Sequence, residues 1–217
     1  MTNQQIINVT AAHIREKFLG EGSGHDWWHI YRVWQTALHI AGVEDADLYI
    51  VQLGALLHDI ADWKFHDGDD RIGSTQARAW LTAQGADNAT IDHVVGIVDH
   101  ISFKGAGVAT PMPTLEGQIV QDADRLDAIG AIGIARAFAY GGAKSRVMHD
   151  PDTAPVQHES FAAYKTAHGT TINHFYEKLL LLKDRMNTAE GRRMAEARHA
   201  FMEGFLNQFH AEWEGER

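Results

Sequence analysis

The segment Ile50–Asp62 places the strongest constraint on how this chain folds. Its residues are almost all apolar or small, and Gln52 is the one polar residue before His58 and Asp59. Such a run is typical of a buried helix, whereas an aspartate is almost never fully buried without a partner. An isolated carboxylate in these surroundings would have to become neutral. Because imidazole and carboxylate together are good ligands for a divalent metal, the adjacent histidine indicates a metal site.

The His-Asp dipeptide alone is not specific. The chain has 14 histidines, and three further His-Asp pairs begin at His25, His66 and His149. Only the pair at His58 ends an apolar helix. The alternative interpretation is that His58 and Asp59 cap each other at that helix end.

Length and periodicity predict the fold class. A chain of 217 residues is long enough for one well-cored domain, and nearly every segment has helical rather than alternating periodicity. We therefore expect an all-α, single-domain compact helical bundle over residues 1–217. Its metal-binding core should span about 20–140, and a C-terminal helical hairpin should span about 157–214.

Composition and charge exclude several classes of function. The absence of cysteine excludes disulfides and thiolate metal sites and is compatible with the cytoplasm. A net charge of −10 disfavours a nucleic-acid polymer as partner, but leaves a small anionic substrate open. No apolar run approaches the length of a membrane span, and the N-terminus lacks the features of a signal peptide. We expect a cytoplasmic protein without a membrane partner.

A second candidate group lies on an earlier helix. Asp26 is a good cap for a helix through about Ala41, on which His25, His29 and Arg32 are spaced by four and three residues. This spacing places the three side chains on one face. The alternative for His29 is a core histidine that binds a backbone carbonyl.

A third candidate group is acidic. The expected long helix from Leu115 to about Tyr140 contains Asp122, Asp124 and Asp127 among alanines, isoleucines and glycines. Asp124 and Asp127 are one turn apart and share a face. Three aspartates in such apolar surroundings are unusual for a solvated stripe. A surface salt bridge to Arg125 is the alternative.

Two further segments carry weaker predictions. The loop 140–157 begins with two glycines and carries Lys144, Arg146 and His149, so it is either a lid over an anionic substrate or a mobile connection. After it, Thr171–Met186 has the spacing of an amphipathic helix. The aromatic stripe near the C-terminus is typical of a core or of a dimer contact, which leaves a homodimer open.

The candidates in order form a known pattern. His29, the pair His58-Asp59 and Asp124 come from three expected helices. In this the chain resembles the HD-domain metal-dependent phosphohydrolases, whose pattern is a first His, a central His-Asp pair and a distal Asp. The resemblance covers most of the chain and is closest to small, single-domain bacterial members, some of which resemble nucleotide pyrophosphohydrolases.

The resemblance implies a site and a cofactor. His29, His58, Asp59 and Asp124 would hold one divalent metal ion, with Mn²⁺ favoured and Mg²⁺, Fe²⁺, Co²⁺, Ni²⁺ or Zn²⁺ open. Asp59 would thereby take part in catalysis, and Asp62, one turn on if the helix persists that far, would orient or deprotonate the attacking water. The expected contacts with a small phosphorylated substrate come from His25, Arg32, Lys104, Arg125 and Asp127.

The expected reaction is hydrolysis of a nucleotide, with a nucleoside triphosphate giving the monophosphate and pyrophosphate. A nucleotidase acting on monophosphates is one alternative. A di-iron oxygenase on the same fold is another and would need ligands from His66, His93 or His100. A non-catalytic nucleotide sensor is the third, and the retained Asp62 argues against it. Guanosine tetraphosphate hydrolases of this fold carry consecutive acidic residues after the central His-Asp pair. Here Trp63 follows Asp62, so the resemblance makes that activity less expected.

Overall fold

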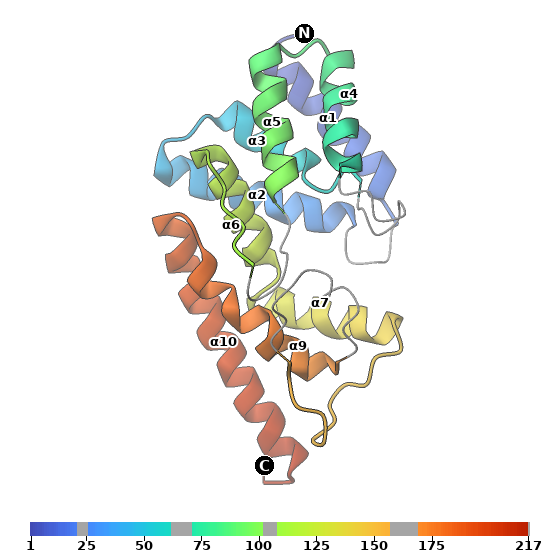
Figure 1. Cartoon of the computed structure of the whole chain (residues 1–217), viewed down its shortest axis with the longest axis vertical. Helices are drawn as coiled ribbons and strands as arrows, with labels where there is room; N and C mark the ends of the chain where they lie inside the picture. Colours follow the sequence, from blue (N-terminus) through green and yellow to red (C-terminus); the bar gives the residue numbers. More distant parts are fainter. Residues whose placement is uncertain (21–25, 62–70, 102–107, 157–168, 217) are drawn as a thin grey trace. The chain divides into compact units, whose positions relative to one another are not determined.

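The structure, a computed structural model, describes residues 1–20, 26–61, 71–101, 108–156 and 169–216. These residues form helices and short 3₁₀ turns, and no strand occurs among them (Figure 1). The predicted all-α class is therefore confirmed. The chain groups into two compact units, one made of 1–103 and 109–123 and the other of 104–108 and 124–217. The expectation of a single domain over 1–217 stays a prediction.

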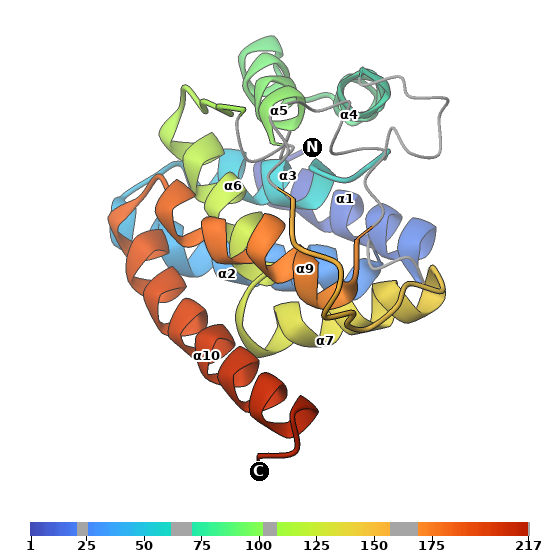
Figure 2. The ribbon, with the colours of Figure 1, turned by 60° about the horizontal axis from the view of Figure 1, so that its bottom comes forward.

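The first unit is built around a central buried helix. Helix α3 packs against α1, α2 and α5, and α4 lies beside α5 in both ribbon views (Figures 1 and 2). Seven of the ten residues of α3 are buried, which agrees with the apolar run that predicted this helix. The helices of this unit are α1 (Asn3–Phe18), α2 (Trp27–Glu44), α3 (Leu48–Leu57), α4 (Ile72–Ala83), α5 (Asn88–His100) and the beginning of α6 (Leu115–Asp127).

Side-chain caps fix where the helices of the first unit begin. Asp26 accepts a hydrogen bond from the backbone N–H of His29, as expected from the sequence. Asp47 caps α3, because its carboxylate accepts a hydrogen bond from the N–H of Tyr49. These caps place His29 in the first turn of α2 and leave His58 directly after the last turn of α3.

The second unit has an aromatic core. Helices α9 and α10 both pack against α7, and Phe138, Phe175 and Phe205 meet with ring centroids 5.8–6.1 Å apart. Phe175 of the second unit is fully buried, and Phe205 of the C-terminal aromatic stripe is half-buried against it, whereas Phe201 of that stripe is exposed. The elements are α7 (Gly130–Ala143), α9 (Thr171–Glu177), two 3₁₀ turns (Leu179–Leu181 and Lys183–Arg185) and α10 (Ala189–Trp213).

Two expected helices are shorter than predicted. The helix expected from Leu115 to Tyr140 is broken after Asp127, where Ile129 is extended and Gly130 has φ +74°, a conformation that glycine adopts without strain. The helix expected over Thr171–Met186 ends at Glu177, and 3₁₀ turns follow it. Apolar periodicity continued across both breaks, because the turns also direct apolar residues into the core.

The described part of the loop after α7 is hydrogen-bonded to α9. The N–H groups of Thr171 and Ile172 donate to the carbonyls of Val147 and Met148, both at 3.0 Å. Asn173 Nδ2 also donates a hydrogen bond to the backbone carbonyl of Thr153 in this loop, at 2.8 Å. A role as a lid stays a prediction. None of the described helices combines the length and the apolar character that crossing a membrane requires.

We expect His174 of α9 to make folding sensitive to acid. Part of the residue reaches solvent, yet burial of the imidazole, aided by the charges of Lys178 and Arg146, lowers its pKa to about 3. An unfolded histidine binds its proton near pH 6.5, so between these values the unfolded chain binds more protons. The free energy of unfolding therefore falls as the pH falls from about 6.5 towards 3. At pH 5 the His174 contribution to this loss should be about 2 kcal/mol.

Urea unfolding of the wild type and of His174→Gln, from pH 8 to pH 5, tests this expectation. At pH 8 the imidazole is neutral in both states, so the difference there reports only the change in packing. At pH 5 the free energy of unfolding of the variant, relative to that of the wild type, should be about 2 kcal/mol higher than at pH 8. Parallel pH curves for the two proteins would show that His174 is not the cause.

Candidate metal centre

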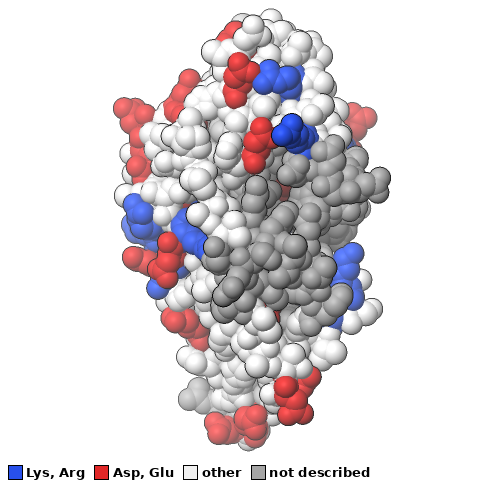
Figure 3. Space-filling view, viewed as in Figure 1, with Lys and Arg blue, Asp and Glu red and all other residues white. Residues whose placement is uncertain are grey.

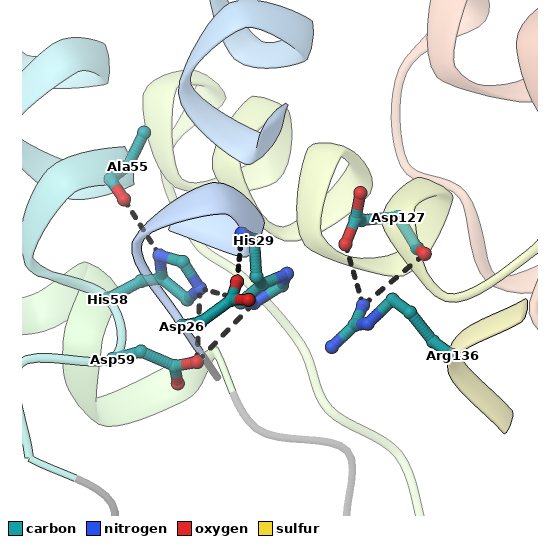
Figure 4. Close-up of polar contacts among 7 residues, drawn as sticks. All are labelled: Asp26, His29, Ala55, His58, Asp59, Asp127 and Arg136. Carbon is teal, nitrogen blue, oxygen red and sulfur yellow. Dashed lines mark hydrogen bonds and ion pairs between the residues drawn. The ribbon is translucent and has the colours of Figure 1, made fainter. Parts of the chain in front are cut away.

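His58 follows the last turn of α3, and one of its ring nitrogens is hydrogen-bonded to the backbone of that helix. His58 is buried, and its Nδ1 lies 2.7 Å from the carbonyl oxygen of Ala55, one turn back (Figure 4). A carbonyl only accepts hydrogen bonds, so Nδ1 carries the proton and Nε2 of the neutral ring keeps its lone pair. This hydrogen bond fixes both the tautomer and the ring orientation, as is usual for a metal-binding histidine.

Helix α2 brings His29 to the same point. Its backbone is fixed by the Asp26 cap at 2.8 Å, and the residue is 1% exposed. His29 Nε2 lies 3.3 Å from His58 Nε2, and the rings meet edge to face (Figure 4). Two imidazole nitrogens this close together need either a shared proton or a shared cation between them.

The carboxylate of Asp59 completes a triangle with the two histidines. Asp59 Oδ2 is 3.4 Å from His29 Nε2 and 3.5 Å from His58 Nε2 (Figure 4). With metal–ligand bonds of about 2.1 Å, neighbouring ligand atoms are about 3.0 Å apart at a right angle and about 3.4 Å apart at a tetrahedral angle. The three atoms therefore fit adjacent positions on one ion. Within the described part of the chain, they are the one such cluster of histidine and acidic side chains that could hold a metal.

Other predicted site residues lie in different surroundings or outside the described part of the chain. His25, Asp62 and Lys104 fall in the undescribed segments, as does His66. Arg32 is half-buried on α2. Asp124 is half-buried on α6 and belongs to the second unit, so its place as a metal ligand stays a prediction.

Asp127 and Arg125, predicted to contact substrate, are both buried and bound to protein groups. Asp127 Oδ2 is 2.7 Å from Arg136 Nη1, which also donates to the backbone carbonyl of Asp127 (Figure 4). Arg125 donates to the backbone carbonyl of Arg185. A substrate contact from either residue stays a prediction.

Arginines cap the C-terminal end of α6. The carbonyl of Leu126 accepts from Arg198 of α10, and that of Asp127 accepts from Arg136 of α7. Cations at this end satisfy carbonyls that have no partner within the helix. Sequence reasoning missed Arg136 and Arg198, although a buried Asp127 in an apolar segment signalled that a cation was needed.

The histidines of α5 do not join the metal cluster. His93 Nε2 lies 3.4 Å from a carboxylate oxygen of Glu116, and His100 is exposed with its Nδ1 2.8 Å from the carbonyl of Gly96. Neither belongs to the group around His58. The described residues thus provide no second cluster for a di-iron site.

Sequence comparison places the chain among known proteins. The profile of the HD domain family matches residues 27–129, a range that contains His29, His58 and Asp59. YpgQ of Bacillus subtilis (strain 168), itself uncharacterized, is 42% identical over 189 residues, which are 87% of this chain and 84% of YpgQ. The chain belongs to the HD domain family. The recognition made from the four motif residues is confirmed.

Solved structures agree with this assignment. A Lactobacillus plantarum protein has a TM-score of 0.86 and 37% identity, with 99% of both chains covered. An HD-superfamily hydrolase from Bacillus thuringiensis has a TM-score of 0.77 and 40% identity, over 99% of this chain and 100% of that one. YpgQ of B. subtilis in complex with ADP has a TM-score of 0.77 and 35% identity, over 98% and 97%. Together these HD relatives and the His-His-Asp cluster support a metal-dependent hydrolase in general.

Proposed function

We propose that this HD protein hydrolyses nucleotides, with a nucleoside triphosphate giving the monophosphate and pyrophosphate, and that it uses one divalent ion. The observation that carries the proposal is the triangle of His29 Nε2, His58 Nε2 and Asp59 Oδ2, with sides of 3.3–3.5 Å. A mixed nitrogen and oxygen donor set suits Mn²⁺, which we favour, and also Fe²⁺, Co²⁺ and Ni²⁺. The ADP bound to YpgQ supports a nucleotide substrate.

The proposal gives each predicted residue a role. Asp124 is the fourth ligand, beside His29, His58 and Asp59. When bound, the ion supplies positive charge that acidifies water and offsets charge on the phosphoryl group. Asp62 orients or deprotonates the attacking water. The residues proposed to bind the phosphates and the nucleoside are His25, Arg32, Lys104, Arg125 and Asp127.

The charges on the face shown in Figure 3 fit a small substrate better than a polymer. On the face shown in Figure 3, the described Lys and Arg side chains are scattered among Asp and Glu and form no continuous basic patch. Non-specific binding of a nucleic-acid backbone requires such a patch. A small phosphorylated compound needs only a few cationic contacts and a metal ion.

Product analysis tests the proposed reaction. Metal-stripped protein is supplied with Mn²⁺, Mg²⁺, Co²⁺ or Ni²⁺ and with nucleoside mono-, di- or triphosphates, and ³¹P NMR identifies the products. Pyrophosphate and monophosphate from a triphosphate are the expected result. Orthophosphate from monophosphates would instead establish the nucleotidase. Silence with every ion and nucleotide, despite tight metal binding, would favour the sensor or, with iron and oxygen consumption, the oxygenase.

A further inference from the structure

Lys17 of α1 reaches the segment that carries the metal ligands. Its ammonium group Nζ donates to the backbone carbonyl of Ile60 at 2.7 Å and to Gln76 Oε1 of α4 at 2.9 Å. These partners are 43 and 59 residues away in the sequence. A single side chain thus joins α1 and α4 to the end of the segment that begins with α3. Lys17 is exposed as a whole residue, and partial burial of its ammonium group lowers its pKa.

The carbonyl that Lys17 holds belongs to the residue directly after Asp59. Ile60 is also fixed in two other ways, because its N–H donates to the carbonyl of Leu57 at 3.1 Å and its side chain is 2% exposed. Its neighbour Ala61 lies close to α4, since a Cβ added at Gly73 would be 3.3 Å from the Ala61 oxygen. The backbone that follows the metal ligand is therefore held by contacts to both α1 and α4.

This backbone directly follows the metal-ligand candidate Asp59 in the chain. The helix proper ends at Leu57, so His58 and Asp59 stand in the turn that follows α3. His58 has its own restraint, the hydrogen bond to Ala55. Asp59 is followed directly by Ile60, whose fixed backbone restrains the turn on that side. Metal affinity is sensitive to the groups that orient ligands, and loss of one typically costs 10–100-fold.

We propose that Lys17 is a positioning residue for Asp59, acting through its hydrogen bond to the Ile60 carbonyl. This inference rests on the proposed function, in which Asp59 binds the ion. Lys17 touches neither the ion nor the substrate in this account. Its ammonium group holds the turn in which Asp59 stands, and it also supplies the positive charge that the carbonyl end of a helix favours.

The test compares Lys17→Met with the wild type and with two matched variants in the full-length protein. Methionine keeps an unbranched stem but removes the donor, so Mn²⁺ affinity measured calorimetrically should fall about tenfold. The turnover number kcat at saturating Mn²⁺ should fall, whereas KM should change little. Lys17→Arg retains a cationic donor and should restore most of the affinity. Gln76→Ala removes the other partner of Lys17, leaves the Ile60 hydrogen bond, and should bind Mn²⁺ nearly as the wild type does.

The outcomes separate the inference from the function on which it rests. If wild-type protein binds Mn²⁺ and Lys17→Met binds it equally well, the inference is wrong, even if the variant melts at a lower temperature. The inference would also be wrong if Gln76→Ala lowered Mn²⁺ affinity as much as Lys17→Met does. The hydrogen bond from Lys17 to Gln76 of α4, rather than the one to the Ile60 carbonyl, would then be the cause. Wild-type protein that binds no Mn²⁺ would contradict the proposed function itself. If Lys17→Met does not fold by circular dichroism, Lys17→Leu, which also lacks a donor, replaces it in the same comparison.

Discussion

Asp59→Asn should weaken Mn²⁺ binding by more than about 100-fold and abolish metal-dependent hydrolysis. The substitution keeps the size of the side chain but removes the negative charge and one acceptor oxygen. In the wild type, Asp59 Oδ2 lies 3.4 and 3.5 Å from the two histidine nitrogens, where it can share their ion. An amide is a weaker ligand, and an NH₂ group turned towards these nitrogens would displace the cation. Titration of metal-stripped protein with Mn²⁺ by calorimetry measures the change.

Asp99→Asn is the matched control for this substitution. Asp99 is exposed on α5 and lies outside the metal cluster, so the same change of charge there should leave Mn²⁺ affinity near that of the wild type. If Asp59→Asn bound Mn²⁺ as tightly as the Asp99 variant, then Asp59 would not be a ligand. The interpretation of His58 and Asp59 as a mutual helix cap would then be favoured.

Arg136→Met should lower the free energy of unfolding by about 3 kcal/mol. The substitution removes a guanidinium group from Asp127, whose side chain is 5% exposed and lies 2.7 Å from Arg136 Nη1. Breaking a buried ion pair from one side is costly because it leaves a charge that water cannot reach. The C-terminal end of α6 would also lose a cap on the Asp127 carbonyl. Urea unfolding at neutral pH measures the difference.

Two comparisons show whether burial is the cause. Arg78 and Asp92 form an ion pair at the same 2.7 Å distance, but their side chains are 50% and 66% exposed. Arg78→Met should therefore cost less than about 1 kcal/mol. The double substitution Asp127→Asn with Arg136→Met also removes the buried negative charge and should recover part of the loss. If Arg136→Met and Arg78→Met lowered the free energy of unfolding equally, burial of the Asp127–Arg136 pair would not be the cause of the loss.

Local sequence patterns were sufficient for the helices that carry the ligands. The apolar run before His58 predicted α3, and Asp26 predicted where α2 begins. The identity of three ligand candidates followed from the same segments, because each residue lies within one turn of a helix end. Capping and amphipathic periodicity are local signals, so a single sequence contains them.

Contacts between distant segments were beyond such patterns. Lys17 and Ile60 are 43 residues apart, and no periodicity connects them. The break between α6 and α7 depends on a positive φ at Gly130, and many glycines in helical patterns have no such role. Arg136 looked like any half-exposed arginine of a helix, and only the fold shows that it reaches Asp127.

The most direct test of the metal centre is pyrophosphate release from nucleoside triphosphates by metal-stripped protein to which Mn²⁺ is returned stepwise. Asp59→Ala is assayed beside the wild type. We predict no release before the ion is added, release that rises to saturation near about one ion per chain in the wild type, and none from the variant. Release by the stripped protein, or Mn²⁺-dependent release by Asp59→Ala equal to that of the wild type, would contradict the account.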